Sequence, residues 1–173
     1  MQVMSVYVSM AIFVFRYKIS NYYWREYNGK IPNDAYAAGA DLLGRATYIG
    51  LVLSRHGLLT GTIVPNYNYI VTTQATLVIP NDIKNTKILC SAEPGQLKWT
   101  KVGEDLLSDS CPFVYGGGEQ DHVLHIGRIN HEGETIVGIV YTDWDEWKGL
   151  WIVYNGKPVH FTSYEILTFN CKN

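Results

Sequence analysis

The chain has 173 residues, with 14 basic and 16 acidic side chains, a net charge of −2 and 47% hydrophobic residues. This composition suits one compact domain with an ordinary core and excludes a disordered tail. The charge balance provides no positive field for phosphate backbones, so we expect no nucleic acid partner. A charged fraction of only 17%, together with many tyrosines, tryptophans and glycines, is typical of a turn-rich β protein.

The first 20 residues are an apolar N-terminal extension or a poor signal peptide, and both interpretations stay open. Residues 3–15 are almost entirely apolar, but no basic residue precedes them and no small-residue cleavage site follows before Arg16. The run is also shorter than the roughly 20 residues that cross a bilayer, so we expect no membrane span. The expected location is therefore the cytoplasm, or the secreted space if the segment acts as a signal peptide.

Beyond this segment, short β-branched or aromatic runs alternate with turn residues. The predicted strands are 47–53, 58–64, 69–79, 123–129, 135–141, 150–154 and 164–169. The turn pairs 56–57, 132–133 and 155–156 each contain glycine and tolerate the positive φ of tight hairpins. These patterns predict an all-β fold of antiparallel hairpins.

Two stretches outside the predicted strands are expected to be loops. Residues 34–43 contain Gly39 and have no clean apolar stripe, so we expect a loop or a single turn there. The three glycines at 116–118 are predicted to form a turn between strands.

Two pairs of glycines indicate an internal repeat. Gly50 and Gly127 lie 77 residues apart, and so do Gly61 and Gly138. Because two copies are too few for a solenoid, we predict one domain, residues 21–173, made of two interlocked antiparallel repeats related by a pseudo-twofold axis. The repeats span about 24–90 and 99–169.

The sequence contains no recognisable catalytic or cofactor motif. It has no nucleophile elbow, phosphate-binding loop or dinucleotide fingerprint, and its five histidines form no compact ligand set. We therefore expect a protein that is not an enzyme and that uses neither a metal nor another cofactor. The cysteines Cys90, Cys111 and Cys171 are too few for a disulfide framework, which leaves buried thiols or a single intrachain bridge.

Residues 141–151 are an aromatic and acidic segment that follows Gly138 of the second repeat. Trp144 and Trp147 alternate there with Asp143, Asp145 and Glu146. Indole rings stack on the apolar faces of sugars and carboxylates bond their hydroxyls, so this surface can bind carbohydrate. A solvated hairpin loop with Trp151 in the core is the other interpretation.

The order of several short motifs resembles the DM-nine repeat family of invertebrate proteins. In the first half these motifs are Trp24, Gly29-Lys30-Ile31-Pro32, Ala38-Gly39-Ala40-Asp41, Tyr48-Ile49-Gly50 and Gly61. In the second half they are Trp99, 116–119, 125–128, Gly138, 153–157 and 164–167. The resemblance implies an all-β protein of two interlocked repeats, often a homodimer, that binds mannose-type glycans on microbial surfaces in innate immunity.

The family's sugar-binding positions carry over only in part. The resemblance implies that Asp41 acts with the residue at a turn lysine, which is Thr62 in this chain. The other interpretation of Asp41 is a turn residue whose carboxylate accepts hydrogen bonds from its own backbone. In the second half Glu119 is the acidic candidate, and the turn lysine position holds Ile139. We therefore expect a mannose-type lectin-like protein with Asp41, Thr62 and Glu119 at its sugar sites. The alternative is an intracellular protein-interaction module that has lost the sugar site and uses Trp144 and Trp147.

Overall fold

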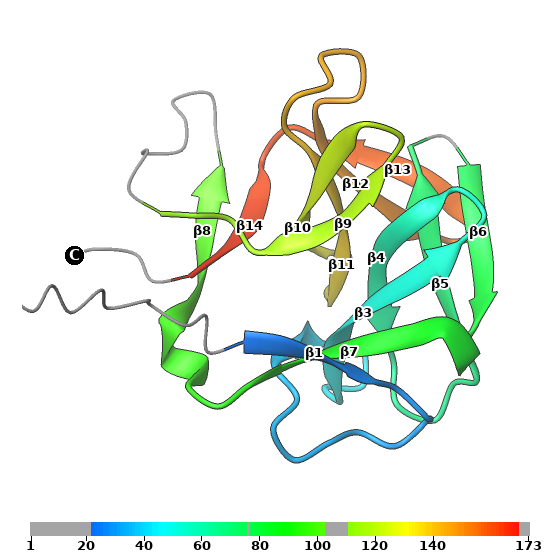
Figure 1. Ribbon diagram of the computed structural model, residues 1–173, viewed down its shortest axis with the longest axis vertical. Helices are drawn as coiled ribbons and strands as arrows, with labels where there is room; N and C mark the ends of the chain where they lie inside the picture. The colour runs from blue at the N-terminus through cyan, green and yellow to red at the C-terminus, as the bar shows by residue number, and fades with distance from the viewer. Residues whose placement is uncertain (1–21, 76, 103–110, 170–173) are drawn as a thin grey trace, which may run out of the picture.

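The computed structural model describes residues 22–75, 77–102 and 111–169, which form one antiparallel sheet of fourteen strands (Figure 1). In chain order the strands are β1 (Tyr22–Glu26), β2 (Ala37–Ala40), β3 (Ala46–Ser54), β4 (Gly57–Ile63), β5 (Tyr69–Gln74), β6 (Leu77–Asp82), β7 (Thr86–Ser91), β8 (Leu97–Val102), β9 (Tyr115–Glu119), β10 (His122–His131), β11 (Glu134–Tyr141), β12 (Gly149–Tyr154), β13 (Lys157–Phe161) and β14 (Tyr164–Phe169). The prediction of an all-β fold is confirmed.

The remaining elements of the described residues are short. Two single 3-10 turns, η1 (Ile83–Asn85) and η2 (Pro94–Gln96), precede β7 and β8. No helix within the described ranges is long and apolar enough to cross a membrane. The N-terminal extension predicted at residues 1–20 lies outside the described residues.

The strands of the two halves pair in the same order. In the first half β7 lies between β1 and β3, β3 also pairs with β2 and β4, and β4 leads through β5 to β6. In the second half β14 lies between β8 and β10, β10 also pairs with β9 and β11, and β11 leads through β12 to β13. One bridge, Leu58 to Gly118, pairs β4 with β9 across the halves. The pseudo-twofold axis itself stays a prediction.

The repeated glycines pair with each other across neighbouring strands. Gly50 lies opposite Gly61 between β3 and β4, and Gly127 lies opposite Gly138 between β10 and β11. A Cβ atom on Gly50 would lie 2.3 Å from Ile70 Cδ1, and one on Gly138 would lie 2.1 Å from a backbone oxygen. The 77-residue spacing therefore marks two strand pairs in which an added Cβ atom would clash with a neighbouring strand or its side chains.

The structure corrects three of the predicted elements. The strand predicted at 69–79 is two strands, β5 and β6, because the chain turns at Ala75, whose φ is 42°. The loop predicted at 34–43 contains β2, which pairs with β3. The triglycine turn predicted at 116–118 is part of β9, where a Cβ on Gly117 would lie 1.9 Å from the carbonyl oxygen of Leu58. The glycines of β9 therefore allow this strand to lie close to β4, and they do not reverse the chain.

Two of the three predicted hairpin turns, 132–133 and 155–156, lie where the sequence placed them, whereas between β3 and β4 the turn residues are 55–56 and Gly57 already begins β4. Glu132 and Gly133, between β10 and β11, have φ angles of 51° and 93°, and Asn155 and Gly156, between β12 and β13, have φ angles of 49° and 70°. Two successive positive φ angles suit the tight turns that match the twist of antiparallel strands.

The core consists of the inward faces of both halves. Its fully buried side chains are mainly β-branched and leucine residues of β3, β4, β7, β10, β11, β12 and β14. Cys90 on β7 is fully buried and free, whereas Cys111 is disulfide-bonded. Cys171 lies outside the described residues.

Candidate functional site

Two cavities contain most of the residues that the sequence points to. The first, called here the Thr62 cavity, has a volume of about 250 Å³. Its walls come from both halves of the chain: Thr47, Thr62, Val64, Tyr67, Tyr69 and Val71 from the first, and residues 134–137, Val153, Asn155 and Gly156 from the second. A cavity between two halves of a sheet is a common place for a small-molecule site.

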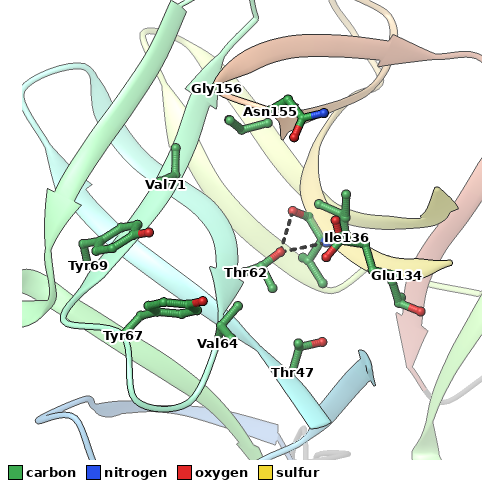
Figure 2. A pocket seen from close by; sticks show the side chains of 13 residues that line it. Thr47, Thr62, Val64, Tyr67, Tyr69, Val71, Glu134, Ile136, Asn155 and Gly156 are labelled. Carbon is green, nitrogen blue, oxygen red and sulfur yellow. Dashed lines mark hydrogen bonds between the residues drawn. The ribbon is translucent and has the colours of Figure 1, made fainter. Parts of the chain in front are cut away.

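The side chain of Thr62 joins the two halves at the floor of this cavity (Figure 2). Its hydroxyl accepts a hydrogen bond from Val137 N at 2.9 Å and lies 3.1 Å from Val137 O, to which it donates. Within the described residues the β11–β12 ladder begins at Ile139, so Thr62 satisfies backbone groups that the ladder leaves open. Both hydrogen-bonding roles of the Thr62 hydroxyl are therefore used inside the protein.

An exposed pair of tyrosines forms one side of the Thr62 cavity. Tyr67 and Tyr69 are 47% and 54% exposed, and their ring centroids lie 5.6 Å apart. In Figure 2 both rings lie on the side opposite Glu134, Ile136 and Asn155. The cavity thus combines aromatic faces with a carboxylate and an amide.

A buried hydroxyl in the same wall has no hydrogen-bond partner among the described residues. Thr47 lines the cavity and is 1% exposed, and its Oγ1 is unpaired. Buried polar atoms in proteins are nearly always bonded, so an unpaired hydroxyl in a cavity-lining residue is a candidate partner for a water or a ligand. The hydroxyl of Thr47 can donate one hydrogen bond and accept others.

Asp41 is held inside its own turn and does not line the Thr62 cavity. Its Oδ1 accepts from the backbone N–H groups of Leu43 and Arg45, both at 2.9 Å, and its Oδ2 lies 2.7 Å from Arg45 Nε. Burial opposes ionisation, but the hydrogen bonds and charge of Arg45 outweigh it and lower the pKa of Asp41. Arg45 also interacts with Tyr67. Asp41 is therefore linked to the cavity-lining Tyr67 through Arg45.

The second cavity, called here the Glu119 cavity, brings together three residues that the sequence points to. It has a volume of about 230 Å³ and is lined by Gln74, Ala75, Glu119, Gln120, Tyr141, Trp144 and Trp147. Glu119 ends β9, Gln74 ends β5 and Tyr141 ends β11, so three strand ends meet there. Both tryptophans lie on the segment between β11 and β12. The predicted aromatic surface of Trp144 and Trp147 therefore lies beside Glu119.

The carboxylate of Glu119 is buried and receives two neutral donors. Glu119 is 2% exposed; the Gln74 amide donates to Oε1, and the Tyr141 hydroxyl donates to Oε2 at 2.7 Å. Burial first, and then the hydrogen bond and charge of Glu119, raise the pKa of Tyr141. The tyrosine therefore stays protonated and acts as a donor.

The aromatic rings of the Glu119 cavity stand nearly perpendicular to one another. The planes of Trp144 and Trp147 differ by 90°, with centroids 6.3 Å apart, and those of Tyr141 and Trp144 differ by 83°. His122 stacks on Trp144 at 4.2 Å, which covers one face of that indole. Trp144 thus contacts both Tyr141 and Trp147 edge to face at the wall of the cavity.

The structure separates the sugar-site residues that the sequence analysis grouped. Thr62 lies in one cavity, Glu119 in the other, and Asp41 in neither. Sequence reasoning missed Thr47, Tyr67 and Tyr69; the only signal was the exposed pattern Pro65-Asn66-Tyr67-Asn68-Tyr69, an aromatic-rich turn. Within the described ranges no group of three or more His, Cys, Asp and Glu residues could hold a metal ion.

No protein-family model matches the chain, and no curated protein matches its sequence.

Proposed function

We propose that the protein is a lectin-like carbohydrate-binding protein without enzymatic activity, and that the Thr62 cavity binds a mannose-type hexose. The unpaired Thr47 hydroxyl, in a cavity with exposed tyrosine faces, is the observation that carries this proposal. The volume of about 250 Å³ lies below the roughly 300–1,000 Å³ of sites for drug-sized ligands, so it suits one small ring.

The chemistry of the lining matches the two kinds of surface that a hexose presents. Apolar C–H faces of a sugar pack on aromatic rings, here Tyr67 and Tyr69. Hydroxyl groups need donors and acceptors, which Thr47, Glu134 and Asn155 supply. Thr62 has a structural part in this site, because its hydroxyl is bonded to Val137.

Useful recognition of a microbial surface requires several such sites at once. One small cavity binds one sugar ring weakly, whereas linked sites gain avidity from the high effective concentration of neighbouring glycan ends. We propose that a homodimer supplies the additional sites. A protein of this kind serves innate immune recognition of mannose-rich surfaces.

The test is titration calorimetry with methyl α-mannopyranoside and mannan. The variant Thr47→Val keeps the side-chain volume and removes only the unpaired hydroxyl, so we expect about three- to tenfold weaker binding from one lost hydrogen bond. Thr86→Val is the matched control, because Thr86 is also buried with an unpaired Oγ1 and does not line the cavity. Equal weakening in both variants, or no binding by the folded wild-type protein, would contradict the proposal.

A second candidate function is a protein-interaction module that has lost the sugar site. The arrangement of Asp41 and Thr62 favours it, since Arg45 holds the carboxylate and Val137 holds the hydroxyl. In that case the wild-type protein is silent in calorimetry, and loss of partner capture in Trp144→Ala and Trp147→Ala variants that remain folded supports the module.

A further inference from the structure

The Glu119 cavity contains a buried carboxyl group that no basic side chain of the described part of the protein pairs with. Glu119 is 2% exposed, and both of its bonding partners, Gln74 and Tyr141, are neutral donors. Among the described residues, no lysine, arginine or histidine nitrogen forms an ion pair with this carboxylate. Because a buried charge is costly without a partner of opposite charge, the cavity favours a cationic ligand over a neutral one.

The walls of the cavity favour the same charge. The faces of aromatic rings are negative, and a cation within about 6 Å of a ring centroid is attracted to them. Trp144 and Trp147 both line the cavity and are part-buried, whereas Tyr141 is only 1% exposed, so the ring surface open to a cation comes from the two indoles. The loop that holds both tryptophans also has three exposed carboxylates, at 143, 145 and 146, and one lysine, Lys148. Its net negative charge attracts cations to the entrance.

The apolar and aromatic share of the cavity wall narrows the kind of cation. An ammonium has three N–H donors and a guanidinium has five, and each donor buried without an acceptor is costly. Glu119 already accepts two hydrogen bonds, and most of the remaining wall is aromatic or apolar. A quaternary ammonium has no N–H group, carries its charge on methyl surfaces, and fits a cavity of about 230 Å³. Aromatic rings compensate its lost hydration.

We propose that the Glu119 cavity binds a small quaternary ammonium group of the kind found in choline. Glu119 supplies the counter-charge, Trp144 and Trp147 supply the aromatic faces, and Gln74 and Tyr141 hold the carboxylate in place. This site is separate from the Thr62 cavity, so the sugar proposal and the cation proposal can fail independently.

The first experiment uses the unmodified protein and needs no variant to fold. Titration calorimetry and tryptophan fluorescence are measured with tetramethylammonium chloride, choline chloride and 3,3-dimethylbutan-1-ol, the neutral isostere of choline. We expect both cations to bind and to perturb tryptophan emission, and the isostere to bind at least about tenfold more weakly. Absence of cation binding, or equal binding of choline and its isostere, would overturn the proposal.

Variants then locate the site. Glu119→Gln keeps the shape of the side chain and removes its charge, so we expect at least about tenfold weaker choline binding and a smaller preference for choline over the isostere. Glu134→Gln is the matched control, because Glu134 is a part-buried carboxylate of the other cavity. Equal losses in the two variants, or displacement of choline by methyl α-mannopyranoside, would place the cation elsewhere and overturn the assignment. The affinities of choline and phosphocholine are then compared. Tighter binding of choline indicates the free compound as the ligand, and tighter binding of phosphocholine indicates a headgroup.

Discussion

The hydroxyl of Thr62 on β4 bonds both the N–H and the carbonyl of Val137 on β11, at 2.9 and 3.1 Å, across 75 residues of sequence. The Thr62 side chain thus bonds the backbone of β11 at a residue that does not pair with β12, because the β11–β12 ladder begins at Ile139. Because Val137 is 3% exposed, its backbone groups depend on this contact. The Thr62 contact also holds the wall that contains Tyr67 and Tyr69 opposite the wall that contains Glu134.

Thr62→Val is predicted to destabilise the fold by about 1–3 kcal/mol, because it leaves a buried donor and acceptor of Val137 unsatisfied. The side-chain volume hardly changes, so packing is not the cause. Urea unfolding, followed by circular dichroism, measures the change. Thr62→Ser keeps the hydroxyl and should lose much less; equal losses in the two variants would show that the hydroxyl contributes little.

Gly138→Ala is predicted to destabilise the protein by about 1–3 kcal/mol or more through overpacking. A Cβ at this position would lie 2.1 Å from the carbonyl oxygen of Trp151, and backbone cannot rotate away as a side chain does. Gly95→Ala is the matched control, because nothing lies within 4 Å of its Cβ position. We expect the thermal midpoint of the control to match that of the wild-type protein. A control that loses as much as Gly138→Ala would refute the packing explanation.

Local patterns predict the hairpins but not the strands that depend on contacts between the halves. The strand pairs β3–β4 and β10–β11 have β-branched runs and turn glycines, so their existence follows from neighbouring residues. The three glycines of β9 have the same local signal as a turn. Their place in β9, with a positive φ of 118° at Gly117 and an irregular register opposite Leu124 and His125, accompanies the close approach of Gly117 to Leu58 of the other half, which no neighbouring residue indicates.

The candidate sites show the same division. The tryptophans and acidic residues of 141–151 are visible as a cluster in the sequence. Gln74 and Tyr141, however, reach Glu119 from 45 and 22 residues away, and no spacing rule relates strand ends that meet in space. The unpaired hydroxyl of Thr47 is likewise a property of its surroundings. A threonine in a predicted strand looks the same in the sequence whether its hydroxyl is bonded or not.

Cys90 is predicted to resist alkylation in the folded protein. Burial first, and then the nearby Asp34 carboxylate, raise the pKa of this thiol to about 11. Since the thiolate is the reactive form, very little of it exists at pH 8, and the fully buried side chain is also out of reach. Iodoacetamide labelling followed by peptide mass spectrometry should show modification at Cys90 only after denaturation. Rapid labelling of this cysteine in native buffer would contradict the prediction.

Stability is predicted to fall as the pH drops from about 7.5 to about 5, in part because of His125. Burial is the main cause that lowers the pKa of His125, and it outweighs a backbone contact at Val114 and the charge of Asp143. A histidine whose pKa is lowered by folding binds fewer protons in the native than in the unfolded state. Its contribution to stability is therefore complete above the unfolded pKa of about 6.5, and is lost as the pH falls below that value.

The variant His125→Gln isolates this contribution, because glutamine is polar, similar in reach and does not titrate in the same range. Thermal midpoints of both proteins are compared at pH 5, 6, 7 and 8, with pH 8 as the internal reference where the wild-type histidine is neutral in both states. We expect the wild-type midpoint to decline more steeply towards pH 5 than that of the variant. Parallel declines would assign the acid sensitivity to other groups, and a steeper decline in the variant would mean that His125 is charged in the native protein.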